Sequence, residues 1–167
     1  NNVGMLAMYY ATRAAIERAE KHGIGVVGMT NSWMSGRSAY YVEMVAKANL
    51  VGIHTVSADR QVAPFGGAKA ALGTNPIAFG FPTAGEPLVI DLALTTVVRG
   101  KIMLAMQRGE KIPEGWAMDR HGKPTTDPKE AIEHGSLLPV QNHPELVQQI
   151  GDGSRRAAMA PGSLPSS

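Results

Sequence analysis

Residues 64–76 read PFGGAKAALGTNP and lead directly into the apolar run IAFGF at residues 77–81. Three glycines, two prolines and a Thr-Asn pair fall within this loop. Gly66 and Gly67 permit positive φ angles and a close approach of the backbone to a ligand, and the Thr-Asn pair supplies short hydrogen-bonding side chains. A loop of this kind ahead of a buried strand indicates a binding site. The alternative is a tight multi-turn connection that needs glycine for its geometry alone.

Apolar runs around this loop predict buried strands, and apolar side chains at helical spacing predict the helices between and after them. The expected strands cover residues 24–29, 50–56, 76–82 and 87–92. The expected helices cover residues 3–21, 38–48, 95–108, 128–133 and 143–150. Ser38 is the expected N-cap of the second helix. Asp127, Pro128 and Glu130 form a capping box for the fourth. The alternation of helix and strand over residues 3–56 is typical of an α/β fold class.

Composition bounds the class of protein. The chain has 167 residues, of which 44% are hydrophobic and 18% charged, so one sizeable globular core is expected. The net charge is only +2 and the basic residues are scattered, which argues against nucleic acid as a partner. No apolar run has transmembrane length, so no membrane contact is expected. The absence of cysteine excludes disulfides and thiolate chemistry and suits a cytoplasmic location.

Two familiar kinds of site are rejected on sequence context. Gly23, Gly25 and Gly28 match the spacing Gly-x-Gly-x-x-Gly. They follow an expected helix and run into a strand, the reverse of a dinucleotide fingerprint, so a helix C-cap and a glycine-bearing strand is the better interpretation. The histidines show no metal-ligand spacing, and no metal site is expected. They are His22, His54, His121, His134 and His143.

Asp91 ends the apolar run at residues 87–92. A carboxylate at the carboxyl end of a strand in an α/β sheet lies where ligands usually bind, and it can accept hydrogen bonds from ribose hydroxyls. It can equally accept backbone N–H groups at the start of the next helix. Spacing alone leaves both interpretations open.

Several segments together resemble the malate/L-lactate dehydrogenase family, whose nucleotide-binding fold is not Rossmann and which also contains ureidoglycolate, sulfolactate and 2,3-diketogulonate oxidoreductases. The matching segments are GIGVV at residues 23–27, the Asn31-Ser32 pair, Tyr40-Tyr41, VAPFGG at 62–67, LGTNP at 72–76, DLA at 91–93, RGK at 99–101, IPEGWA at 112–117 and KPTTDP at 123–128. The resemblance implies a mixed sheet covered by helices, with an incomplete NAD(P)-binding α/β domain over residues 1–139. Residues 140–167 depart from the family pattern and are expected to form a divergent, flexible tail. The start without Met and this ending suggest a piece of a larger protein.

The resemblance also implies an activity and a set of site residues. The activity is hydride transfer between NAD or NADP and a 2-hydroxy acid/2-oxo acid pair, in a homodimer. The cofactor-binding residues that it implies, together with those of the glycine loop, are Ser57, Ala58, Gly66, Gly67, Thr74, Asn75, Asp91, Leu92 and Ala93.

One position departs from the family pattern where catalysis is concerned. The proton-transferring histidine of the family lies two residues past the Asn-Ser pair, and Met34 stands there in this chain. A methionine neither donates nor accepts a catalytic proton, so the catalytic residues stay unassigned. Arg37 is a candidate contact for a substrate carboxylate, with a solvated loop charge as the alternative, and Tyr40 is a candidate replacement acid, with a core or interface tyrosine as the alternative. The resemblance further implies an amino-terminal Ser-His-Gly segment that grips the substrate and a Gly-rich turn with a cofactor-binding Lys after Pro139, and neither is found in this sequence. The fragment is expected to be inactive for that reason. The competing hypothesis, motivated by Met34, is a non-catalytic dimerising or ligand-binding module derived from the family.

Overall fold

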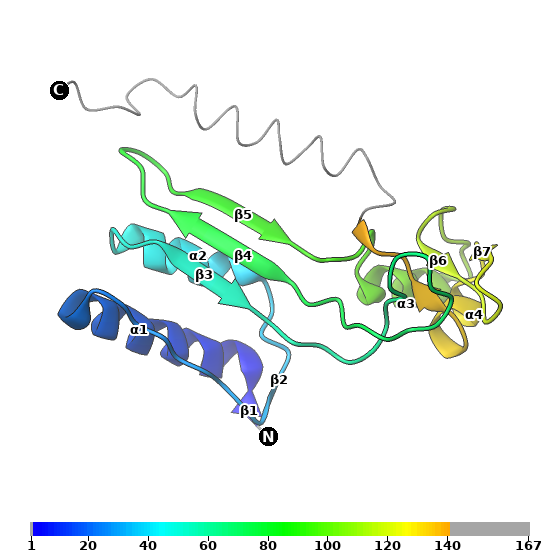
Figure 1. Ribbon diagram of the computed structural model, residues 1–167, viewed down its shortest axis with the longest axis horizontal. Coiled ribbons are helices and arrows are strands. Elements are labelled where there is room, and N and C mark those ends of the chain that lie inside the picture. Colours follow the sequence, from blue (N-terminus) through cyan, green and yellow to red (C-terminus); the bar gives the residue numbers. More distant parts are fainter. Residues whose placement is uncertain (1, 141–167) are drawn as a thin grey trace. The chain divides into compact units, whose positions relative to one another are not determined.

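The computed structural model describes residues 2–140, which divide into two compact units (Figure 1). The first unit contains residues 2–55 and 77–92, and the second contains residues 56–76 and 93–140. Helices and strands occur in both units, so the expected α/β fold class is confirmed.

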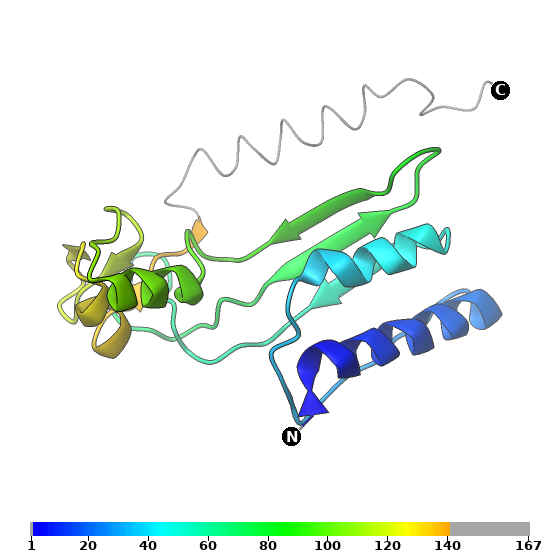
Figure 2. The ribbon, with the colours of Figure 1, turned by 180° about the vertical axis from the view of Figure 1, so that it is seen from behind.

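The first unit is a three-stranded antiparallel sheet with two helices. The strands β3 (Gly52–Thr55), β4 (Ile77–Phe81) and β5 (Leu88–Leu92) pair in that order. The helices are α1 (Gly4–His22) and α2 (Ser38–Lys47), and a short parallel pair is formed by β1 (Asn2–Val3) and β2 (Ser32–Trp33). Helix α2 packs on one face of the sheet and α1 packs against α2 (Figure 2).

Two glycines allow α2 to approach the sheet closely. A Cβ atom on Gly80 of β4 would lie 2.3 Å from the carbonyl oxygen of Val42, and one on Gly52 of β3 would lie 2.8 Å from Cβ of Val45. Both contacts are shorter than real side chains adopt, so any larger residue would push the helix away. Glycine is therefore needed where α2 lies over Gly52 and Gly80.

The opposite face of this sheet is apolar. Ile53, Phe79 and Ile90 are paired across β3, β4 and β5 and share that face, because side chains alternate along a strand. Ile53 is 66% exposed. The helix that packs on the sheet, α2, lies on the other side.

Both expected helices of this unit are confirmed, but the predicted cap of α2 is wrong. Gly23 ends α1 with φ 83°, as a C-cap glycine does. Ser38 lies inside α2, and the N-cap position is taken by Arg37, whose side chain makes no capping hydrogen bond. A carboxylate from the sheet takes over this role, as described below.

The strand expected at residues 24–29 is also wrong. The segment forms no strand, and Ile24 and Val26 are 77% and 86% exposed. It runs back along α1 instead: a Cβ atom on Gly25 would lie 2.1 Å from the carbonyl oxygen of Ala15. An apolar run becomes a strand only where a neighbouring strand supplies hydrogen bonds, and among residues 2–140 none pairs with this one.

The second unit contains another three-stranded antiparallel sheet and two helices. Its strands are β6 (Ala117–Met118), β7 (Pro124–Thr125) and β8 (Ser136–Leu137), in the order β7-β6-β8. Its helices are α3 (Arg99–Arg108) and α4 (Pro128–Glu133). The buried core consists of Val62, Val97, Ile102, Ile112, Ala117, Ala131 and Leu137.

Helix boundaries in this unit differ from expectation in two ways. Helix α3 begins at Arg99 because Thr95 instead bridges to Pro139. Asp127 caps α4 as predicted, but Glu130 does not complete the capping box. Its carboxylate binds Arg120 at 2.8 Å, and this hydrogen bond lowers the pKa of Glu130 to about 2. The helix expected at residues 143–150 and the tail expected at 140–167 lie outside the described residues, apart from residue 140.

Candidate functional site

Several predicted cofactor residues of the second unit lie close together. The backbone N–H of Ala58 donates to Oδ1 of Asn75 at 3.1 Å. A Cβ atom on Gly73 would lie 2.3 Å from the carbonyl oxygen of Ala58, so glycine is required for this close contact. Asn75 has φ 34°, a conformation that asparagine tolerates better than most residues. The two ends of the loop at residues 57–76 are therefore fastened to each other.

A third segment joins this cluster. The N–H of Leu94 donates to the carbonyl oxygen of Thr74 at 3.0 Å, which places the neighbouring Ala93 beside the loop end. The N–H of Val140 in turn donates to the carbonyl oxygen of Leu94 at 3.2 Å. We refer to Ala58, Thr74, Asn75 and Ala93 as the loop-end cluster. Ser57 adjoins it in sequence and is exposed.

Gly66 and Gly67 lie elsewhere in the second unit. Val62 and Leu72 pair as an antiparallel bridge, so the residues between them form a turn that carries both glycines. Gly66 has φ 75°, and no heavy atom would lie within 4 Å of an added Cβ. Gly67 donates its N–H to the carbonyl oxygen of Pro64 at 2.8 Å. The backbone at Gly66 is therefore open to an approaching group.

Asp91 belongs to the first unit and caps α2. Its Oδ2 atom accepts the backbone N–H of Ala39, the second residue of the helix, at 2.8 Å. Asp91 is exposed, so its carboxylate also faces solvent. Asp91 therefore does accept a backbone N–H at the start of a helix. That helix is α2, which precedes Asp91 in the chain, and not the next helix as predicted. Leu92 ends β5 and is half-buried.

A buried histidine lies near this cap, and the sequence analysis assigned it no role beyond packing. His54 is 6% exposed, and its Nδ1 atom has no hydrogen-bond partner among the described residues. Its strand partner Ala78 pairs on the other side with Asp91, and the rings of His54 and Tyr41 lie 5.4 Å apart. Burial lowers the pKa of His54, although the negative charge of Asp91 partly opposes that shift. His54 and Asp91 are the polar residues in register on the sheet face that also carries Gly52, Ala78 and Gly80.

Met34 is held by its backbone. It has φ 64°, which is uncommon for a residue with a side chain, and it is 61% exposed. A Cβ atom on Gly4 would lie 2.6 Å from the carbonyl oxygen of Met34, so the start of α1 presses on this position. The thioether carries no proton to transfer.

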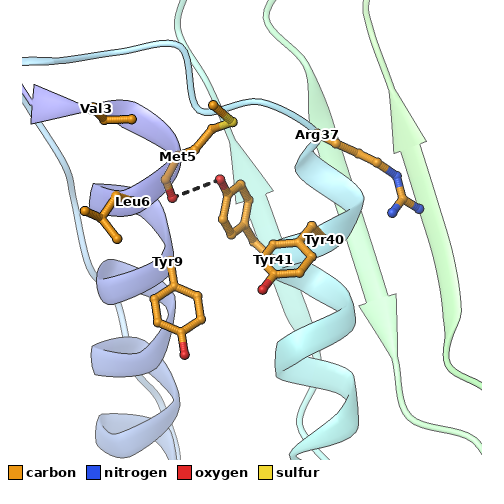
Figure 3. A pocket seen from close by; sticks show the side chains of 7 residues that line it. All are labelled: Val3, Met5, Leu6, Tyr9, Arg37, Tyr40 and Tyr41. Atoms are coloured by element: carbon orange, nitrogen blue, oxygen red, sulfur yellow. Dashed lines mark hydrogen bonds between the residues drawn. The ribbon is translucent and has the colours of Figure 1, made fainter.

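An apolar hollow of about 560 Å³ lies between the starts of α1 and α2 (Figure 3). It is lined by Val3, Met5, Leu6, Tyr9, Arg37, Tyr40 and Tyr41. The hydroxyl of Tyr41 contacts the carbonyl oxygens of Ser35 and Met5, the latter at 3.3 Å. Arg37 binds Glu43 at 3.0 Å in an exposed ion pair, and its guanidinium extends away from the tyrosines in Figure 3. Tyr40 stacks edge-on against Tyr41 and is 46% exposed, so its hydroxyl is accessible.

Residues 1–151 match the malate/L-lactate dehydrogenase family. The chain belongs to this family. The family match confirms the resemblance that the sequence motifs indicated.

Relatives within the family use either nicotinamide cofactor. The (2R)-3-sulfolactate dehydrogenase (NADP(+)) of Chromohalobacter salexigens is 48% identical over 75% of this chain and 38% of its own length. The ureidoglycolate dehydrogenase (NAD(+)) of Escherichia coli O157:H7 is 42% identical over 77% of this chain and 37% of its own length. A solved dehydrogenase structure from Sinorhizobium meliloti, 37% identical, superposes with a TM-score of 0.79 over 95% of this chain and 46% of that one.

The chain spans between 37% and 41% of the length of the curated family members that it matches. Within the described part of the chain, no helix is long and apolar enough to cross a membrane. No group of three or more potential ligand side chains converges on a metal site among residues 2–140.

Proposed function

We propose that this protein is an NAD(P)-dependent dehydrogenase that transfers a hydride between a 2-hydroxy acid and its 2-oxo acid. The observation that carries the proposal is the family match over residues 1–151. The clustering of Ala58, Thr74, Asn75 and Ala93, which the sequence motifs nominated as cofactor contacts, supports it.

The residues present fit a nicotinamide dinucleotide in part. Asp91 keeps an exposed carboxylate oxygen that can accept a ribose hydroxyl, and the backbone at Gly66 is open to close approach. Among the described residues, the hydroxyls of Thr74 and Ser57 make no hydrogen bond, so both can serve a ligand. Ala58 contributes no hydroxyl, and its N–H is already taken by Asn75. We infer that Leu92 and Ala93 contact the cofactor through their backbone.

NAD(P) supplies or accepts the hydride at its nicotinamide ring. The protein must hold that ring against the substrate carbon and move one proton at the substrate oxygen. Met34 cannot move that proton. Tyr40 is the tyrosine of the described chain that lies nearest in sequence to this position, it is 46% exposed, and we propose its phenolic hydroxyl as the candidate acid. Arg37 is already paired with Glu43, which favours the solvated-charge interpretation of that residue.

The first test measures cofactor binding separately from turnover. NAD and NADP are titrated into the 167-residue chain by calorimetry, and turnover is then assayed with malate, lactate, sulfolactate and ureidoglycolate. We expect binding of at least one nucleotide and no turnover, because the chain spans only 37% to 41% of the length of the curated dehydrogenases that it matches. Robust turnover by this chain would overturn the proposed inactivity, and failure to bind either nucleotide would overturn the dehydrogenase proposal.

A second candidate function is a non-catalytic dimerising or ligand-binding module, and Met34 is the observation that favours it. Met34→His in a full-length family context distinguishes the two. A gain in rate supports the dehydrogenase, and an unchanged rate supports the module. We further propose a homodimer, which sedimentation measures directly, and a cytoplasmic location, which suits a chain without cysteine.

A further inference from the structure

A small hollow in the second unit is lined by two arginines from different elements. Arg99 is the first residue of α3, and Arg60 lies in the loop after β3. Gln61, Ala131 of α4 and Leu137 of β8 also line it. The volume is about 60 Å³. One water needs about 10–15 Å³ on this measure, so the hollow has room for a group the size of a few waters and not for a nucleotide base.

The backbone fixes this arrangement. Gln61 accepts the N–H of Leu137 at 2.8 Å and donates its own N–H to the carbonyl oxygen of Leu72 at the same distance. Arg60 is therefore attached to a segment tied to β8 on one side and to the loop on the other. Helix α3 packs against α4, which carries part of the lining. Both arginines thus start from well-ordered backbone.

Neither arginine has its charge neutralised within the described part of the chain. Among residues 2–140, no carboxylate lies within ion-pair distance of Arg60 or Arg99. Of the two acidic side chains of the neighbouring helix α4, that of Glu130 is paired with another arginine. Glu130 binds Arg120 at 2.8 Å, and Glu133 lies 3.9 Å from His134. Two arginines without a carboxylate partner among the described residues therefore line one small hollow.

We propose that Arg60 and Arg99 together bind a phosphate group in this hollow. A guanidinium presents its donors in a planar fork that matches phosphate oxygens. Two such forks carry a charge of +2, which a phosphate monoester of about −1.5 to −2 balances and a single carboxylate does not. The phosphate can be free or can belong to a larger molecule. Assigning it to the 2′-phosphate of NADP rests on the proposed function, since NAD has no monoester.

The test is calorimetry on the 167-residue chain at constant ionic strength, with inorganic phosphate, acetate, NADP and NAD as separate probes. The variants are Arg60→Gln and Arg99→Gln. Arg108→Gln is the matched control, because it makes the same charge change at the other end of α3. We expect phosphate affinity to fall about tenfold or more in each variant, as for a lost charge-assisted hydrogen bond, and to stay within about twofold in the control. Acetate should bind weakly throughout.

The outcomes separate the inference from the proposed function. If phosphate does not bind, binds equally well to all variants, or is matched by acetate, the site is refuted. If phosphate shows the expected loss while neither dinucleotide binds, the site stands and the dehydrogenase proposal fails. If the Arg60 and Arg99 variants lose affinity for both NADP and phosphate but not for NAD, the phosphate group that binds in the hollow is that of NADP. If NADP affinity is insensitive, the site stands and serves free phosphate or another ester. Thermal unfolding confirms that each variant is folded, and exposed Arg60 provides the test should Arg99→Gln unfold.

Discussion

Asp91 shows what a single residue can and cannot reveal in a sequence. Its position at a strand end predicted either a ligand contact or a helix-start acceptor. The structure realises the second, because Oδ2 binds the N–H of Ala39. The two residues are 52 positions apart, and no local pattern indicates which helix start a distant strand end will meet. The sequence left the two alternatives open, and neither named the start of α2 as the partner of Asp91.

Removing this carboxylate should destabilise the first unit. Asp91→Ala leaves the start of α2 without its cap, and losing an N-cap acceptor costs about 0.5–2 kcal/mol. Asp91→Asn keeps an acceptor oxygen and should lose less. Urea unfolding followed by circular dichroism measures the difference. Asp59→Ala is the control, since Asp59 is exposed and makes no hydrogen bond among the described residues. Equal stability of the two alanine variants would contradict the capping role.

His54 should make stability depend on pH. Its folded pKa is lowered by burial, so below the ordinary value of about 6.5 the unfolded chain binds a proton that the folded chain does not. The free energy of unfolding should therefore fall as the pH drops from about 7 toward 5. His54→Leu should flatten this part of the profile, whereas His22→Leu, at an exposed position of the same unit, should not. An unchanged slope in His54→Leu would show that folding does not lower the pKa of this imidazole.

For the individual strands and helices, the sequence-based predictions hold where a neighbouring element pairs or packs with the segment. Strands β3, β4 and β5 lie within the predicted ranges, and each pairs with a neighbouring strand. The apolar run at residues 24–29 was also predicted to be a strand and forms none, since no described strand pairs with it. Propensity is a property of the segment, but a strand requires a partner. Helix α3 was predicted to start at residue 95 but starts at Arg99, and Thr95 instead forms a bridge with Pro139, a residue distant in sequence.

The close approach of α2 to the sheet predicts a large effect for one methyl group. Gly80→Ala places a Cβ atom 2.3 Å from the backbone oxygen of Val42. The helix must move, and overpacking of this kind costs about 1–3 kcal/mol. Gly85→Ala, in the turn after β4, meets no atom within 4 Å and serves as the control. Denaturant midpoints compare the two. A denaturant midpoint for Gly80→Ala as high as that of the control would mean that α2 does not lie as close to Gly80 as the structure shows.

At the scale of the whole molecule, the family could be identified from sequence because its motifs are spread along most of the chain. The loop-end cluster brings together residues from both ends of the loop at 57–76 and from the segment after β5. The resemblance implied that these residues share a site. Sequence spacing could not predict it, because hydrogen bonds between distant segments produce no periodic pattern in the sequence. Gly67 and Asp91, both named above as cofactor-binding residues, fall in different units, and their contact with one cofactor stays a prediction.

The apolar face of the first unit predicts how the 167-residue chain behaves in solution. Ile53, Phe79 and Ile90 lie side by side across the sheet, and Ile53 is 66% exposed. Exposed apolar strands attract one another, so we expect concentration-dependent self-association, measured by sedimentation. Ile53→Lys should reduce it with little effect on stability, because the side chain is already largely exposed. Ile24→Lys removes a comparable apolar group at a position 77% exposed outside the sheet and should leave association unchanged. If both variants reduce association equally, general surface hydrophobicity and not this sheet face drives it.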